Sequence, residues 1–180
     1  MPRRKIFRVP FAKAVRGFGA NRKGSAAVEF ALIGGPLFMV IFAIIEVSLM
    51  YFAQQALETA TQDAARQILT GQAKNYSQTQ FTNLVCSNLA SFLSCGGIRV
   101  AAQSFPSFAD IQPFDPLDST GQFVANFPYT SGASGTIMLV QTAYRWPLFV
   151  TGLGLNMSNA GSGYRLLTAT AAFRNEPYGS

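Results

Sequence analysis

The chain has 180 residues and a mass of 19.4 kDa, which suffices for one domain with an attached helix. Charged residues make up 12% of the chain and hydrophobic residues 49%, whereas an average soluble domain is about 25% charged. This deficit, with a mean hydropathy of +0.21, indicates a membrane segment or surfaces that partners bury. The sequence contains no histidine and only two cysteines, which excludes Ser-His and Cys-His catalysis and a four-thiolate metal site. We therefore expect no enzymatic activity, no metal and no other cofactor.

Positive charge is concentrated at the N-terminus. Eight of the 14 Lys and Arg residues lie in residues 1–23, which contain no acidic residue, so the remaining chain has six positive and eight negative charges. A basic run of this kind can bind anionic lipid or nucleic acid. Because the run ends directly at a long apolar segment, we interpret it as a topology signal and expect no nucleic-acid partner. Residues 1–24 are thus predicted to form a basic, cytoplasmic leader.

The apolar segment is long enough to cross a membrane. The sixteen residues from Phe30 to Ile45 lack a polar side chain, and the segment continues through Glu46 to Ala53. A helix over residues 30–53 would be about 36 Å long, which spans the ~30 Å core of a bilayer. A buried core helix of a soluble protein is the weaker interpretation. The charge asymmetry predicts a single pass with the N-terminus inside and residues after about 54 outside, where Glu46 can reach the headgroups.

Two features of this predicted helix bear on its packing. Pro36 follows two glycines and is expected to bend or loosen the helix, because it removes a backbone hydrogen bond. Beyond the membrane the helix is predicted to continue to residue 70, ahead of a glycine. There a narrow apolar stripe contacts either the chain's own globular part or identical or related helices. The stripe consists of Leu57, Ala60, Ala64 and Ile68.

Residues 71–180 are predicted to form a small α+β head outside the membrane. A short helix is expected over residues 81–93 and strands over residues 98–105, 136–145 and 164–173, which together form an antiparallel sheet. Three carboxylates between the first two strands could suggest a metal site. They lack the spacing of a calcium loop, so a solvated loop is the expected structure. These carboxylates are Asp110, Asp115 and Asp118.

A family resemblance covers residues 24–66. It rests on Gly24 to Ile33, on Pro36, on Ile45-Glu46, and on the blocks Gln54 to Leu57 and Asp63 to Arg66. These residues resemble the TadE/TadG-like pseudopilins of the tight adherence (Tad/Flp) systems, which build adhesive type IV pili in bacteria. The size of the chain is closer to TadE-like members. The resemblance implies a pilin-like fold that assembles through its N-terminal helix.

The resemblance also implies a processing site. A prepilin peptidase of the inner membrane would cut between Gly24 and Ser25, which places Glu29 and Phe30 at the fifth and sixth mature positions. Major Flp pilins prefer Tyr where this chain has Phe30. In the membrane, Glu29 would pair with the amino group of its own or a neighbouring subunit and fix the register of assembly, since an unpaired carboxylate there costs at least ~2.5–3.5 kcal/mol. The alternative is that Glu29 reaches the cytoplasmic headgroups.

Two hypotheses of function stay open at this point. The first is a minor pilin or pseudopilin whose partners are the inner membrane, the prepilin peptidase and the other pilins and pseudopilins of the Tad machinery, with or without incorporation in the pilus. The second is an uncleaved single-pass envelope scaffold or binding protein. In both, the predicted periplasmic location of Cys86 and Cys95 favours a disulfide, with two unpaired thiols as the alternative.

Overall fold

The computed structural model describes residues 24–150 and 156–177. The predicted leader, apart from Gly24, lies outside these residues. The described chain falls into two compact units, which meet within one helix: residues up to Ala43 belong to the first and residues from Ile44 to the second.

The long N-terminal helix, α2, runs from Ser25 to Leu69 and contains Pro36. The loss of the proline N–H therefore does not end the helix. The helix ends where Gly71 takes a positive φ of 75° and donates its N–H to the carbonyl of Ile68, 2.9 Å away. Glycine is the residue that adopts this conformation without strain, which explains the position of the helix end.

The second helix, α3, spans Gln78–Ser87 and differs from the helix expected over residues 81–93. It begins three residues earlier because Ser77 and Gln80 form a capping box, in which each side chain bonds the backbone N–H of the other. It ends six residues earlier, where the Ser87 hydroxyl bonds the Leu84 carbonyl and Asn88 follows. Ser and Asn compete for backbone groups in this way and are weak helix formers. A short 3-10 helix, η2 (Cys95–Gly97), then leads into the sheet.

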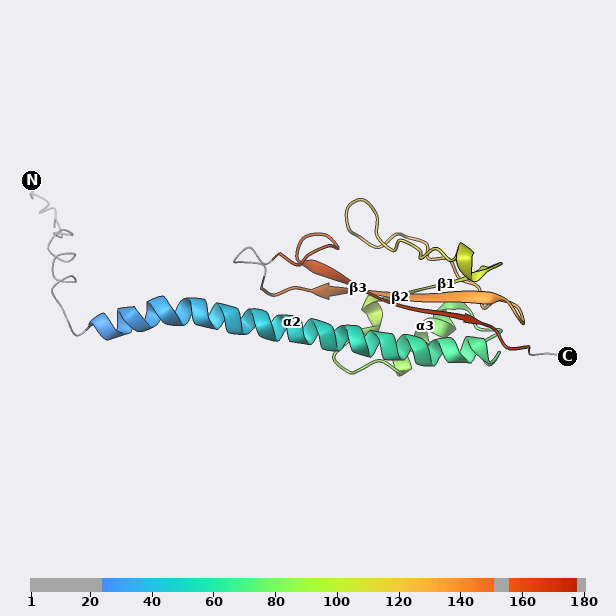
Figure 1. The fold of residues 1–180 in the computed structure, drawn as a ribbon, viewed down its shortest axis with the longest axis horizontal. Helices are drawn as coiled ribbons and strands as arrows, with labels where there is room; N and C mark the ends of the chain where they lie inside the picture. Colours follow the sequence, from blue (N-terminus) through green and yellow to red (C-terminus); the bar gives the residue numbers. More distant parts are fainter. Residues whose placement is uncertain (1–23, 151–155, 178–180) are drawn as a thin grey trace, which may run out of the picture. The chain divides into compact units, whose positions relative to one another are not determined.

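Three antiparallel strands form the sheet in the order β1-β2-β3 (Figure 1). They are β1 (Ile98–Phe105), β2 (Ile137–Pro147) and β3 (Tyr164–Arg174). In the register, Ile98 lies opposite Tyr144 and Pro147 lies opposite Tyr164. A further 3-10 helix, η3 (Phe108–Asp110), follows β1. The long apolar helix with a small α+β head of one short helix and an antiparallel sheet confirms the predicted fold class.

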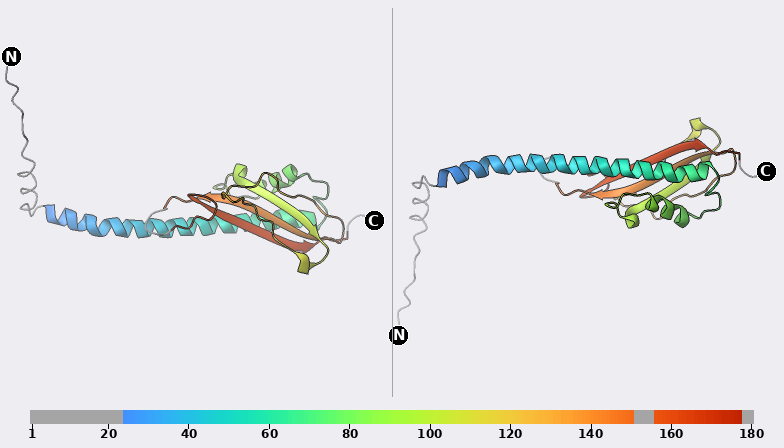
Figure 2. Two further views of the ribbon diagram at one scale, coloured as in Figure 1. Left: turned by 90° about the horizontal axis from the view of Figure 1, so that it is seen from above. Right: turned by 90° about the horizontal axis from the view of Figure 1, so that it is seen from below.

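The core of the second unit lies between the helices and one face of the sheet (Figures 1 and 2). Alternate residues of β1 and β2 point to this face, as strand geometry requires. They include Val100 and Val140, which are buried with Phe81 of α3 and with residues of α2. The loop between β1 and β2 bonds the opposite face: Phe114 donates its N–H to Gln141 Oε1 at 3.0 Å and accepts from Gln141 Nε2 at 2.8 Å.

Candidate functional site

The first part of α2 presents apolar side chains on its surface. Phe30, Leu32 and Ile33 are each 70% exposed, and only 11% of the most apolar 18-residue window is buried. A core helix of a soluble protein would bury these side chains, so this segment is not the core of the described chain. By length and hydropathy α2 is the one described helix able to cross a membrane, and it fits a single-pass anchor.

The four residues of the predicted processing site lie at the start of this helix. Gly24 precedes α2, Ser25 is its first residue, and Glu29 and Phe30 follow in the second turn with exposed side chains. A side chain added at Gly24 would meet no atom within 4 Å. A substitution there therefore leaves the described structure undisturbed, and its effect on processing can be measured directly.

The apolar stripe lies in the chain's own head. Leu57, Ala60, Ala64 and Ile68 are all fully buried and share one cluster with the sheet and α3. Thr61 lies beside them, and its hydroxyl donates to the Leu57 carbonyl at 2.6 Å. Of the two alternatives for the stripe, the structure shows contact with the chain's own globular part. Neighbouring helices would have to contact other faces of α2.

Glu46 is the residue whose position differs most from the sequence interpretation. Instead of reaching toward headgroups, its side chain is only 4% exposed. Its carboxylate accepts hydrogen bonds from the backbone N–H groups of Phe149 and Val150, the latter at 2.9 Å. Glu46 thereby joins α2 to the segment that follows β2. The sequence held a signal for this, because Glu46, Met50 and Ala53 continue the spacing of the buried stripe.

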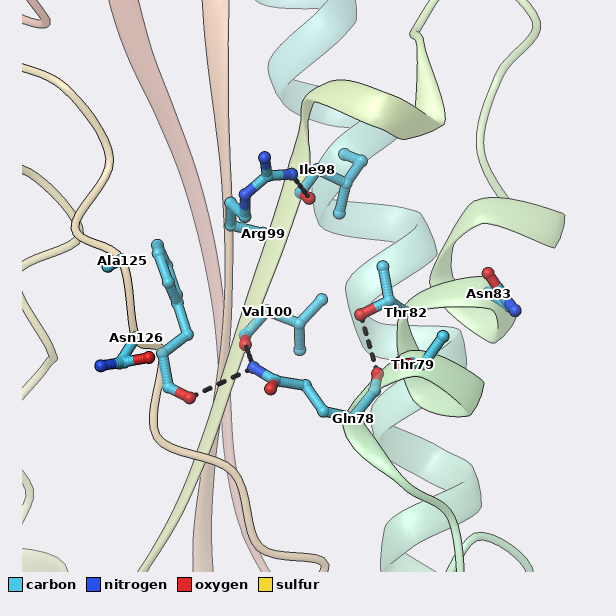
Figure 3. A pocket seen from close by; sticks show the side chains of 10 residues that line it. Gln78, Thr79, Thr82, Asn83, Ile98, Arg99, Val100, Ala125 and Asn126 are labelled. Carbon is cyan, nitrogen blue, oxygen red and sulfur yellow. Dashed lines mark hydrogen bonds between the residues drawn. The ribbon is translucent and has the colours of Figure 1, made fainter.

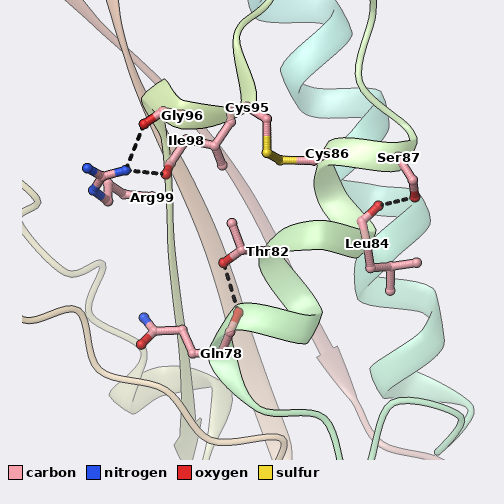
Figure 4. The surroundings of a disulfide bond; sticks show 9 residues. All are labelled: Gln78, Thr82, Leu84, Cys86, Ser87, Cys95, Gly96, Ile98 and Arg99. Carbon is pink, nitrogen blue, oxygen red and sulfur yellow. Dashed lines mark hydrogen bonds between the residues drawn. A yellow bond between two sulfur atoms is a disulfide. The ribbon is translucent and has the colours of Figure 1, made fainter.

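Cys86 and Cys95 form a disulfide, with their Cα atoms 5.4 Å apart (Figure 4). Cys86 belongs to the last turn of α3, and Cys95 begins the 3-10 helix that precedes β1. The bond therefore ties the end of α3 to the start of the sheet. Beside it, Arg99 donates to the carbonyls of Gly96 and Ile98 at 3.1 and 2.8 Å.

A pocket of about 310 Å³ lies between α3, β1 and residues 125–127 (Figure 3). The Gln78 amide lies within it and donates to the carbonyls of Val100 and Phe127 at 2.8 and 3.2 Å. Arg99 is the charged residue of the lining, which contains no carboxylate, thiol or imidazole. The pocket can offer hydrogen bonds to a ligand, and its lining includes the hydroxyls of Thr79 and Thr82 but no carboxylate or imidazole beside them that would act as a general base.

The three carboxylates of the β1–β2 loop each stabilise their own turn. Asp110 accepts from the Ser107 hydroxyl at 2.7 Å, and Asp115 accepts from a backbone N–H two residues on at 3.1 Å. Asp118 accepts from the hydroxyl and N–H of Thr120 and from the N–H of Gln122, and these bonds hold its pKa below the usual value. Among the described residues no group of three potential ligands could hold a metal ion.

The geometry is that of an apolar helix, which fits a single-pass membrane anchor, followed by a small α+β head. Residues 24–66 match the family model described as TadE-like protein. This match confirms the resemblance inferred from the sequence. It covers Gly24, which precedes α2, and the helix itself as far as Arg66. The comparisons with curated proteins and with solved structures gave no match.

Proposed function

We propose that this protein is a minor pilin or pseudopilin in the assembly of a Tad/Flp-type adhesive pilus. The TadE-like segment indicates a protein associated with the Tad pilus, and it is the observation that carries the proposal. The match begins at Gly24, the residue after which a prepilin peptidase would cut. Too many residues lie outside α2 for a major Flp pilin, which is little more than this helix.

In this proposal α2 crosses the inner membrane with residues 1–23 in the cytoplasm and the head in the periplasm. The asymmetry of charge supports this orientation, since basic residues stay on the cytoplasmic side. The orientation has its own test: alkaline phosphatase fused after Ser180 is expected to be active in cells. An inactive fusion of a stable, full-length protein would contradict the topology.

Assembly takes place through the lipid-exposed part of α2. The buried stripe is occupied by the head, whereas Phe30, Leu32 and Ile33 offer their side chains to other helices in the membrane. Glu29 adjoins this surface, and cleavage would create a new amino group on Ser25 one turn away. A carboxylate paired with such an amine, on the same or a neighbouring subunit, would fix the register between helices.

Two matched substitutions test the proposal in the host cell. Gly24→Leu is expected to leave the precursor uncut, because the peptidase must bring its carboxylates close to the backbone there. Gly35→Leu is the control, since a side chain added at Gly35 also meets no atom within 4 Å. The length of the chain is measured by immunoblot and mass spectrometry. Normal cleavage of the Gly24→Leu protein would contradict the processing site.

A second pair of substitutions tests the proposed role of Glu29 in pilus assembly. Glu29→Ala is expected to lower pilus number and surface adhesion at least about tenfold while membrane insertion is unchanged, because the substitution removes the pairing carboxylate but makes the segment more apolar. Glu58→Ala changes a carboxylate in the head part of α2 and serves as the control. Unchanged pilus number in the Glu29→Ala strain would contradict the register role.

A further inference from the structure

The contact between Glu46 and the end of β2 places a buried carboxylate beside an exposed apolar side chain. Glu46 accepts from two consecutive backbone N–H groups, those of Phe149 and Val150. Between these bonds and the sheet, Leu148 is buried at 9% exposure, while the Phe149 side chain is 77% exposed. The carboxylate thus holds a short backbone segment against α2 with a phenyl ring directed outward.

The surface of α2 near Glu46 is equally apolar. Ile45, Leu49 and Phe52 share one face of the helix and are 48%, 47% and 67% exposed. Tyr51 is 65% exposed. Tyr side chains are enriched where a bilayer core meets its headgroups, which suits Tyr51. Phe52 and Phe149 are fully apolar side chains of the kind that enter the acyl boundary.

Counting along α2 gives the depth of this region. A hydrocarbon core of ~30 Å corresponds to about 20 helical residues. If the core begins at Ala26 it ends near Ile45, and if it begins at Phe30 it ends near Leu49. Either limit places Glu46 at the outer boundary of the hydrocarbon. Phe149, bonded to Glu46 through its N–H, lies at the same level of α2.

The two hydrogen bonds to Glu46 lower the cost of placing polar groups at the boundary of the hydrocarbon. Backbone N–H groups and a carboxylate are each costly where water is scarce, and each is stabilised when bonded to the other. Charge also fits a lipid surface. The sequence from Ile137 to Asn175 contains no acidic residue, so these strands bring no negative charge to the proposed contact. Arg145 and Arg165 lie on the strands near this end of the sheet. There Arg145 interacts with Asp118 and bonds the Ala160 carbonyl.

We propose that the end of β2 is a second membrane contact, in which Phe149 enters the outer leaflet of the bilayer that α2 spans and Glu46 holds it there. The inference rests on the proposed anchoring of α2. Phe149 lies at the same level of α2 as the exposed apolar side chains of Ile45 and Leu49, and this shared level favours lipid as the occupant over a second copy of the chain.

Depth-dependent fluorescence quenching tests this contact. Trp146 is the one tryptophan of the chain, so Trp146→Phe provides a background without indole. In this background Phe149→Trp reports on the proposed contact, and Phe108→Trp is the matched control. Phe108 is 57% exposed and follows β1 at the opposite end of the sheet. The full-length proteins are reconstituted in vesicles that contain lipid with a nitroxide near the headgroup or near the chain end.

We expect the indole at position 149 to be quenched by the shallow nitroxide at least about twofold more than the indole at position 108, as for a side chain at the acyl boundary. Adding Glu46→Ala is expected to remove most of this difference, while Glu46→Gln, which keeps an acceptor oxygen, retains more of it. Equal quenching at the two positions would overturn the inference. If the indole at position 149 were shielded from the nitroxide only at a high protein-to-lipid ratio, the occupant of this surface would be a second copy of the chain, and the inference of a lipid contact would be overturned.

A parallel measurement separates this inference from the anchor on which it depends. Alkaline carbonate extraction of the same vesicles is expected to leave the protein in the membrane fraction. Release by carbonate would contradict the anchoring by α2 and overturn the inference with it. Retention together with equal quenching at positions 149 and 108 would overturn the second contact alone.

Discussion

The two parts of α2 have similar helical structure but opposite surroundings. Before Ile44 the helix exposes long apolar side chains, such as Leu32 and Ile33. After Ile44 it buries a stripe of small residues, such as Ala60 and Ala64, beneath a sheet and a second helix. The first part is suited to lipid or to other helices, and the second is folded into the head. One continuous helix thus leaves the apolar surface of its first part exposed and buries the stripe of its second part against the chain's own head.

The largest expected effect compares one isoleucine from each part. Ile68→Ala should lower the free energy of unfolding of the head by about 2–5 kcal/mol, because it leaves a cavity where the side chain is fully buried. Ile33→Ala, at a side chain 70% exposed, should change it by less than about 0.5 kcal/mol. Urea unfolding of the full chain in detergent micelles, followed by Trp146 fluorescence, measures both. Equal changes in the free energy of unfolding for the two variants would contradict the division of α2 into an exposed first part and a buried second part.

The disulfide offers a second way to sharpen the comparison. The Cys86→Ala/Cys95→Ala double variant should lower the free energy of unfolding by up to about 3 kcal/mol, since the bond closes a short loop. Retention in the membrane after carbonate extraction should be unchanged, because it depends on the first part of α2. Treatment of the wild-type protein with reductant is the control and should give the same loss. An unchanged urea midpoint would show that the bond adds nothing to the head.

A smaller effect is expected from the hydroxyl pair that joins α2 to β2. The Thr61 hydroxyl donates to Leu57, so it accepts from the Thr142 hydroxyl at 2.6 Å, and both residues are fully buried. Thr61→Val should cost about 1–3 kcal/mol, because it leaves the Thr142 donor without an acceptor. The double variant Thr61→Val/Thr142→Val should regain most of this loss. A double variant as unstable as the single one would show that the pair is not the cause.

The smallest effect concerns alkaline pH. Burial raises the pKa of Tyr129 to about 12, from an ordinary value of 10.0. The folded state therefore disfavours the phenolate of Tyr129. The contribution of the neutral Tyr129 side chain to the free energy of unfolding is complete below pH 10 and is lost as the pH rises toward 12. Tyr129→Phe should change stability little at pH 7, where the buried hydroxyl makes no hydrogen bond with a described residue, and should reduce the loss between pH 10 and 12. A parallel pH dependence in wild type and variant would contradict this.

Local patterns in the sequence predict most of the elements. The helix end at Gly71 and the three strands follow from glycine, hydropathy and β-propensity, and the strand bounds differ by at most two residues from those observed. The predicted bounds of the second helix, residues 81–93, are wrong at both ends: the capping box of Ser77 and Gln80 starts α3 earlier, and Ser87 and Asn88 end it earlier. The role of Glu46 could not be read from local pattern alone, since its bonding partners lie more than 100 residues further along the chain.

The central claim is that this protein is processed and assembled as a pilus component. The most direct measurement is the intact mass of the wild-type protein purified from the membranes of its own host, with the N-terminal peptide sequenced. We predict a mature chain that begins at Ser25 and has lost the eight positive charges of residues 1–23. A chain that begins at Met1 or Pro2 would contradict the account and favour an uncleaved membrane-anchored envelope protein.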